Sequence, residues 1–331
     1  MIITHPRIPI DKDHTVMAKI LGPAVGHRLL FLGIAAFVAS APGARAATSL
    51  PETFASPQQA VDALVAAARN ADAQGLLKIF GPAGRDLVSS GDPIADKNAD
   101  AGFVEHYGKR HEILLDAKNK ATLVLGDEEW AFPIPLVRHG KTWHFDTGAG
   151  VEEILNRRVG RNELNAIEVC RSYVVAQRNY AADGGDDLSR GDYARKFVST
   201  PGHHDGLYWP MKPGEAESPI GPEMAAARAE GYGGSDQTAP SQNQPYHGYF
   251  YKILERQGPA APVGARNYLV DGHMIAGFAL IAFPAKYGDS GVTTFIVNQD
   301  GIVFEKDLGP DTAMVAPTIA EFNPDLTWKM P

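Results

Sequence analysis

The sequence predicts an α+β protein, and two patterns lead to this class. Apolar residues recur at helical spacing over residues 60–68 and again over 164–174. Two-residue turn signals, His139-Gly140 and Asp271-Gly272, each separate runs that read as β-strands. Helices first, then a hairpin sheet, then a packing helix is an order typical of a compact α+β domain.

The N-terminal domain is expected to span residues 47–182. Its first helix begins with a capping box at Ser56-Pro57-Gln58-Gln59. Pro133 and Pro135 lack the N–H that a ladder needs, so the strand that contains them is expected to be an edge or bulged strand. The helical hairpin followed by curved strands resembles the cone-shaped NTF2-like class. The other expected elements are helices at 73–80 and 101–107, strands at 121–125, 130–138 and 141–146, and a helical zone that runs from after Gly148 to about Ala182 with an interruption at Gly160.

A bridge rich in Gly, Pro, Ser and Gln is expected over residues 183–245, with one helix at 222–230. The remaining residues, 246–331, read as a β-rich module. Its expected strands are 248–255, 266–270, 274–283, 293–297 and 302–306.

Residues 17–46 have the order of a secretory signal peptide. A weakly basic segment after Met17 leads into the apolar run Leu29–Ala39 and then the triplet Ala44-Arg45-Ala46. The run is shorter than the roughly 20 residues of a membrane anchor. We therefore expect Sec-type export with cleavage after Ala46 and a periplasmic or secreted location. Met17 is a plausible true start, and the sequence leaves open whether residues 1–16 are translated.

Composition narrows the range of partners. Residues 1–46 hold five of the 31 Lys and Arg and two of the 39 Asp and Glu, so the remaining 285 residues carry 26 basic and 37 acidic residues, a net charge of −11. This charge argues against nucleic acid or an anionic membrane surface as a partner. Cys170 is the sole cysteine, so no intramolecular disulfide forms. After the signal no stretch reaches membrane-spanning length.

Specific segments resemble the bacterial family of exported proteins of unknown function called DUF2950, over nearly all of the mature chain. The resemblance implies an envelope location and assigns no activity. More weakly, the C-terminal module resembles the sheet of type II secretion pseudopilins and pilin-like proteins, although the chain lacks their N-terminal assembly helix. The segments that carry the family resemblance are Trp143–Thr147, Glu152–Leu164, Tyr246–Tyr249, Gly277–Leu280, Tyr287–Gly291, Thr294–Gly301 and Lys306–Pro310.

Three motifs could carry chemistry. The segment Gly288-Asp289-Ser290-Gly291 resembles a serine-protease nucleophile loop, but no histidine segment matches and a turn favours the same residues. His203-His204-Asp205 lacks metal-ligand spacing, and the acidic segment 183–187 lacks an EF-hand pattern. We expect Ser290 to have a structural role, so that its replacement by Ala lowers the free energy of unfolding by less than about 1 kcal/mol. We expect neither a metal nor a cofactor.

Two clusters remain open between a structural and a binding role. Arg157, Arg158 and Arg161 lie among glutamates; either they form a surface lattice with Glu153 paired to Arg157, or one arginine turns inward and anchors the domains. The second cluster is a concentration of aromatic residues before and within the first strand of the C-terminal module. If these side chains are exposed they would form a surface that binds a peptide or glycan, and if they are buried they belong to the core. The candidate binding residues are Tyr208, Trp209, Tyr246, His247 and Tyr249.

The sequence favours a non-enzymatic envelope protein that binds a partner (a protein, peptide or glycan) or an assembly. The alternative is a periplasmic hydrolase or isomerase with a pocket in the N-terminal domain or at the domain junction. His144, Asp146 and Glu152 are its candidate catalytic residues.

Overall fold

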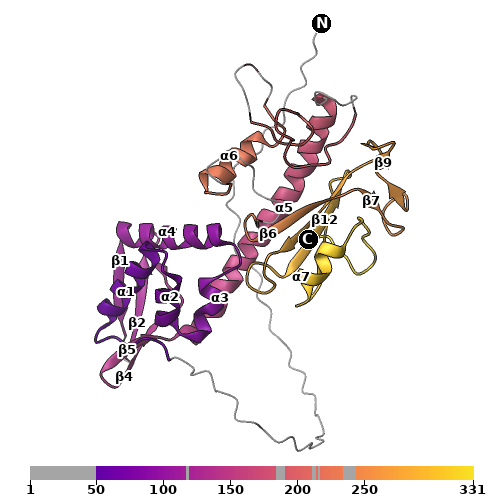
Figure 1. Cartoon of the computed structure of the whole chain (residues 1–331). Helices are drawn as coiled ribbons and strands as arrows, with labels where there is room; N and C mark the ends of the chain where they lie inside the picture. Colours follow the sequence, from indigo (N-terminus) through magenta and orange to yellow (C-terminus); the bar gives the residue numbers. More distant parts are fainter. Residues whose placement is uncertain (1–49, 117–118, 184–190, 211–213, 215–216, 234–243) are drawn as a thin grey trace, which may run out of the picture. The chain divides into compact units, whose positions relative to one another are not determined.

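The computed structural model describes residues 50–116, 119–183, 191–210, 214, 217–233 and 244–331, and Figure 1 shows it. The signal-like segment and the acidic run after residue 183 lie outside the described residues. Within the described ranges the chain is an α+β protein, as predicted, with helices and antiparallel sheets. None of the described helices is long and apolar enough to cross a bilayer.

The N-terminal part combines four helices with one antiparallel sheet. The strand order is β1-β2-β4-β5, and β3 pairs with β2. The elements are α1 (Pro57–Arg69), α2 (Ala73–Phe80), η1 (Pro82–Gly84), α3 (Arg85–Val88), α4 (Pro93–Lys109), β1 (His111–Leu115), β2 (Lys120–Leu125), β3 (Trp130–Ala131), β4 (Leu136–His139) and β5 (Thr142–Phe145).

Local signals account for most of these boundaries. The Ser56 hydroxyl accepts the N–H of Gln59 and caps α1, while the Gln59 side chain reaches back to the N–H of Ala55. The predicted strand 130–138 is split into β3 and β4, because Pro133 and Pro135 cannot donate to a ladder. The helix predicted at 101–107 is longer and begins at Pro93, directly after a capping aspartate.

A long helix leads into the C-terminal part. Helix α5 (Val151–Asp183) follows η2 (Thr147–Ala149) and runs without the predicted interruption at Gly160. A glycine inside a helix lowers its stability by about 1 kcal/mol without breaking the hydrogen-bond pattern. The helix therefore continues and reaches the C-terminal sheet.

The C-terminal part is built on a four-stranded antiparallel sheet in the order β13-β12-β11-β6. Two small ladders, β7–β8 and β9–β10, extend from it. The elements are α6 (Gly221–Ala229), β6 (Tyr249–Leu254), β7 (Arg256–Gln257), β8 (Arg266–Asn267), β9 (Leu269–Val270), β10 (His273–Met274), β11 (Ala279–Pro284), β12 (Thr293–Asn298), β13 (Val303–Asp307), α7 (Thr312–Val315) and η3 (Ala316–Thr318).

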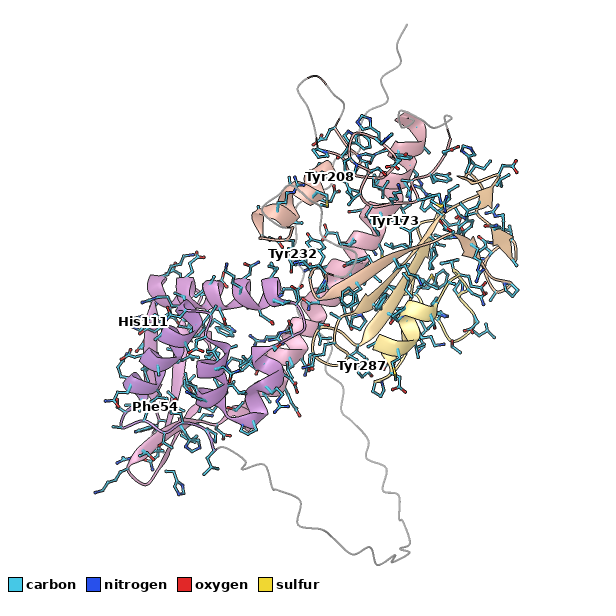
Figure 2. All side chains as sticks on the ribbon, viewed as in Figure 1. Phe54, His111, Tyr173, Tyr208, Tyr232 and Tyr287 are labelled. Carbon is cyan, nitrogen blue, oxygen red and sulfur yellow. The ribbon has the colours of Figure 1, made fainter. Side chains whose placement is uncertain are left out.

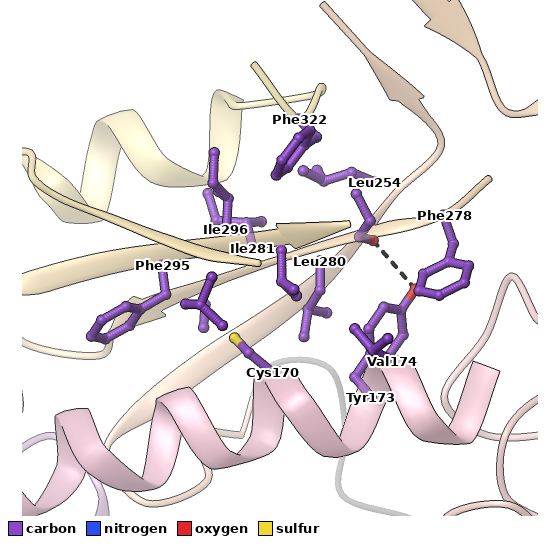
Figure 3. Close-up of a cluster of buried hydrophobic side chains, with 14 of the residues drawn as sticks. Cys170, Tyr173, Val174, Leu254, Phe278, Leu280, Ile281, Phe295, Ile296 and Phe322 are labelled. Carbon is purple, nitrogen blue, oxygen red and sulfur yellow. Dashed lines mark hydrogen bonds between the residues drawn. The ribbon is translucent and has the colours of Figure 1, made fainter. Parts of the chain in front are cut away.

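The described residues belong to one compact unit, Thr48–Pro331. Their buried hydrophobic side chains form two separate cores. One core lies between α1, α2 and the N-terminal sheet. In the other, Cys170, Tyr173 and Val174 of α5 pack on the C-terminal sheet, and the Tyr173 hydroxyl donates to the Ala279 carbonyl at 3.3 Å (Figure 3). Helix α5, which the sequence assigned to the N-terminal domain, therefore contributes its buried face to the C-terminal core. The domain boundaries at 182 and 245 stay a prediction.

The described part of the 183–245 bridge is not a bare linker. Residues 198 and 208 form a β-bridge, and Leu207 and Trp209 are buried in the C-terminal core. The helix predicted at 222–230 is present as α6. The composition of the bridge predicted a loop, but scattered apolar side chains suffice to bury parts of such a segment against an existing core.

Candidate functional site

A buried aspartate connects α4 to the C-terminal part. Asp92 is 0% exposed, and its Oδ1 accepts the N–H groups of Ile94 at 3.1 Å and Ala95 at 3.0 Å, which caps the helix. Its Oδ2 accepts the Tyr232 hydroxyl at 2.9 Å and the Gly248 N–H at 2.8 Å. Four hydrogen bonds thus satisfy the buried carboxylate. We call Asp92, Tyr232, His247 and Gly248 the Asp92 junction.

His247 is held on several sides within this junction. Its Nε2 lies 2.9 Å from a Glu230 carboxylate oxygen, and its Nδ1 lies 2.7 Å from the Asn165 amide nitrogen. The imidazole stacks on Tyr232, which Figure 2 labels, with Tyr246 edge-on at a centroid distance of 4.1 Å. Two predicted binding residues, Tyr246 and His247, therefore lie together and half-buried, with the His247 ring already engaged by protein groups.

Gly248 allows the closest backbone approach in the junction. A Cβ there would lie 2.5 Å from the Asn162 amide nitrogen and 3.1 Å from the Ser290 Cβ, and φ is +77°. The Asn162 amide donates to the Ser290 carbonyl at 2.9 Å. Only glycine combines this conformation with this space.

Ser290 stabilises a turn. Its buried hydroxyl accepts the Lys286 N–H at 2.9 Å and donates to the Lys286 carbonyl at 3.1 Å. Lys286 in turn pairs with Asp289 and, at 2.9 Å, with Asp86. The hydrogen bonds recorded for the hydroxyl are thus all to backbone atoms of one residue, an arrangement typical of a turn and not of a nucleophile paired with a base.

One arginine of the predicted cluster turns inward. Arg158 donates to the carbonyl oxygens of Asp86 at 2.8 Å and Leu87 at 2.6 Å, which joins α5 to α3. Burial lowers the pKa of Arg158, and the nearby carboxylates, Asp96 first among them, oppose that shift. Arg157 pairs with Glu153 on the exposed face, as predicted. The cluster therefore contains both arrangements that the sequence left open.

Asp96 and Asp100 of α4 share the field of Arg158. Desolvation raises the pKa of Asp100 to about 6, repulsion from Asp96 adds to this, and Arg158 opposes it. Desolvation also raises the pKa of Asp96, although Ser90 donates two hydrogen bonds from its N–H and hydroxyl. Titratable groups with perturbed pKa values beside a cation are a recognised sign of a functional site.

The predicted catalytic residues lie elsewhere. His144 is on β5 opposite Val137, Asp146 follows that strand, and Glu152 is exposed in the first turn of α5. No hydrogen bond or ion pair among the described side chains joins the three, and their role stays a prediction. Asp92, Asp96 and Asp100 were not predicted from the sequence as site residues. The Asp92-Pro93 pair, a cap followed by a first-turn proline, was the available signal.

The remaining predicted binding residues are core residues. Tyr249 is 0% exposed and donates to the Thr293 carbonyl at 2.9 Å. Tyr208 and Trp209 are buried; Trp209 stacks on His204 at 4.3 Å, and the Arg228 guanidinium lies 4.9 Å from the Tyr208 ring. These three do not contribute an exposed aromatic surface.

Two other sequence candidates also have local partners. Desolvation alone would raise the pKa of the Asp205 carboxyl, but hydrogen bonds from Lys196 and Thr200 outweigh it and lower this pKa to about 2. Over the described ranges, no group of three or more His, Cys, Asp or Glu could hold a metal ion. Burial raises the pKa of the Cys170 thiol to about 12, which keeps it protonated.

A groove of about 760 Å³ lies beside β6. Its walls come from β6, from the β7–β8 ladder and from residues 320–321. The Gln257 side chain stiffens one wall, because its amide donates to the carbonyls of Pro262 and Gly264 and its oxygen accepts the Tyr268 hydroxyl. The charged residues along the groove are Lys252, Glu255, Arg256, Arg266 and Glu321.

Comparison with known proteins now gives the family. The profile described as "Protein of unknown function (DUF2950)" matches residues 51–330. The chain belongs to the DUF2950 family. No curated protein and no solved structure matches it significantly. The resemblance seen in the sequence is thus confirmed, while the weaker likeness to pilin-like sheets and to the NTF2-like class stays a prediction.

Proposed function

We propose that this DUF2950 protein is exported to the periplasm and acts there as a non-catalytic protein that binds a polypeptide partner. The signal-like order of residues 17–46 supports the location. The groove beside β6 carries the binding role, because it is the place where a stiffened wall, charges of both signs and the margin of a sheet meet. The net charge of −11 after residue 46 disfavours nucleic acid as the partner.

The titratable groups of the Asp92 junction, together with Arg158 of α5, support the same proposal. Asp92, His247 and Arg158 each have at least two partners within the protein, at 2.6–3.1 Å. Side chains held in this way stabilise the packing of α4, α5 and the segment before β6. A binding surface elsewhere therefore accounts better for the features of the fold than a reaction centre at the junction.

Photo-crosslinking in the periplasm tests the proposal. A benzophenone amino acid replaces Asn267 on the groove wall, and a control variant carries it at Glu112, exposed on β1. We expect the Asn267 variant, in the native host, to form one discrete adduct with an envelope protein and the Glu112 variant to form none. Mass spectrometry of the same purified protein should find Ala47 at its N-terminus. An uncut N-terminus in cytosolic protein, or equal labelling from both positions, would contradict the proposal.

The enzymatic alternative has one observation in its favour. Desolvation raises the pKa of Asp100 to about 6, which suits a general acid or base near neutral pH. A hydrolase or isomerase would then use the Asp96–Asp100–Arg158 group. Screening the purified protein against ester, amide and glycoside substrates tests this, and activity lost in Asp100→Asn but retained in Arg266→Glu would favour the enzyme.

A further inference from the structure

Among the described residues, one stretch of the outer edge of β6 has no backbone hydrogen-bond partner. Strand β6 is the last strand of its sheet and pairs with β11 on one side only. The Ala285 N–H bonds to the Gly248 carbonyl, so these opposed residues are a hydrogen-bonded pair. In an antiparallel ladder such pairs alternate. Phe250, Lys252 and Leu254 therefore direct their N–H and C=O groups to β11, and the residues between them direct theirs outward.

The outward groups are used at both ends of the strand. Tyr249 exchanges backbone hydrogen bonds with Tyr246, and the Glu255 carbonyl accepts the Tyr268 N–H at 2.9 Å. Between these ends lie Tyr251 and Ile253. No residue in the described part of the chain provides a backbone partner for their outward N–H and C=O groups. The open edge thus runs over Tyr251–Ile253 and borders the groove, which Lys252 and Ile253 line.

Two cations that line the groove have no carboxylate partner among the described residues. The Lys252 ammonium donates to the Pro317 carbonyl at 2.7 Å, and the Arg266 guanidinium lies 5.9 Å from the Tyr268 ring. Among the described residues neither forms an ion pair, whereas Arg256 pairs with Glu321 and Glu255 with Arg195. The groove of an acidic protein thus presents unneutralised positive charge.

From these features we propose that the groove receives an extended, acidic peptide segment of a partner protein, which adds to the sheet alongside β6. Main-chain hydrogen bonds to Tyr251 and Ile253 hold the segment, and its carboxylates contact Lys252 and Arg266. The inference rests on the proposed binding function and specifies the partner's chemistry.

A second copy of this chain fits the edge less well. Two-fold antiparallel pairing of β6 across residues 251–253 would place the two Lys252 side chains opposite one another. Like charges directly opposed across an antiparallel pair are destabilising, and a lysine on an edge strand commonly prevents such self-pairing. An acidic segment meets the same lysine favourably.

Peptide selection on the mature chain, residues 47–331, tests the inference. A phage library of random nine-residue peptides is panned against the immobilised protein, and the enriched peptides are synthesised with a fluorescent label. We expect enrichment of Asp or Glu at alternate positions. Affinity by fluorescence anisotropy should fall at least tenfold for Arg266→Glu. Absence of acidic enrichment overturns the inference.

The backbone edge has its own matched pair of variants. Ile253→Pro removes an outward N–H without touching the bonds to β11, and Ile253→Thr keeps that N–H. We expect at least a tenfold loss of affinity for the proline variant and less than threefold for the threonine variant, with unchanged circular dichroism in both. Equal affinities would overturn strand addition.

If Ile253→Pro does not fold, a charge-swap variant tests whether the groove binds acidic peptides. Lys252→Glu with Arg266→Glu should lose the acidic peptides and gain peptides in which Lys replaces each Asp or Glu. Failure of this swap overturns the inference. The crosslink from Asn267 distinguishes the two levels of the argument: an adduct formed by a partner without acidic extended segments refutes the inference and leaves the binding function, whereas no adduct refutes both.

Discussion

Asp100→Asn should stabilise the protein, and the gain should depend on pH. The carboxyl of Asp100 is half-buried on α4, and desolvation, with repulsion from Asp96, raises its pKa from 3.8 to about 6. The folded chain therefore holds this proton more tightly than the unfolded chain does. Below about pH 4 the Asp100 carboxyl is mostly protonated in both the folded and the unfolded chain, so it does not change the free energy of unfolding. Between about pH 4 and about pH 6 the unfolded state ionises first, so stability falls as pH rises.

The size of the effect follows from the shift. A rise from 3.8 to about 6 corresponds to about 3 kcal/mol of lost stability above pH 6. Solvent screening of a half-buried carboxyl reduces this to about 1–2 kcal/mol. An asparagine has no ionisation to suppress, so the variant should recover that amount at pH 7.5 and almost nothing at pH 3.5.

Urea unfolding at a series of pH values measures this difference. The control is Asp62→Asn, on the exposed face of α1, where we expect a change within about 0.5 kcal/mol at every pH. A carboxyl ¹³C titration of Asp100 by NMR gives the pKa directly. A stability gain for Asp100→Asn that is equal at pH 3.5 and pH 7.5, or absent at pH 7.5, would refute the reasoning.

The remaining predictions concern stability at the Asp92 junction and its neighbours, and thermal or urea unfolding checks each. Asp92→Ala should lower the free energy of unfolding by about 3 kcal/mol, because it removes a helix cap and leaves the Tyr232 O–H and the Gly248 N–H without their acceptor. A loss under about 1 kcal/mol would show that these contacts do not stabilise the fold. Gly248→Ala should cost at least about 2 kcal/mol, because its Cβ meets the Asn162 amide and φ is positive; the nearby Gly288→Ala, with positive φ but open space, should cost less, and the reverse order would contradict the steric argument. Ser290→Ala should lower the free energy of unfolding by about 1–2 kcal/mol, more than the turn alone predicts, because the Lys286 N–H is left without its acceptor. Labelling of Ser290 by a fluorophosphonate would instead reveal a nucleophile.

Elements with a strong local code could be predicted from the sequence. Helix α1 begins where Ser56 and Pro57 place it, and the β4–β5 hairpin forms as predicted, although its two-residue turn is Gly140-Lys141, one position after the predicted His139-Gly140. The weaker predictions failed where the local signal was ambiguous. Helix α4 was predicted too short, since its first turns contain few apolar residues, and only the Asp92-Pro93 pair marks its start.

Residues of the candidate site were harder to predict for a different reason. Asp92 meets Gly248, 156 positions later in the chain, and Arg158 meets Asp86, 72 positions earlier. No periodicity links positions so far apart, because such contacts depend on which surfaces pack together. The raised pKa of Asp100 likewise results from burial, which composition does not report.

The family, the α+β class and the segments that form most helices and strands could be predicted from the sequence, because hydrophobic period and turn chemistry are local properties. Tertiary packing settles three other features: α5 contributes to the C-terminal core, Arg158 turns inward while Arg157 stays exposed, and β6 ends its sheet with an edge over Tyr251–Ile253 that no described residue pairs. Those features depend on the order of strands in a sheet and on which faces are buried together. The free energy of that packing is shared among residues distant in the chain, so no local pattern records it.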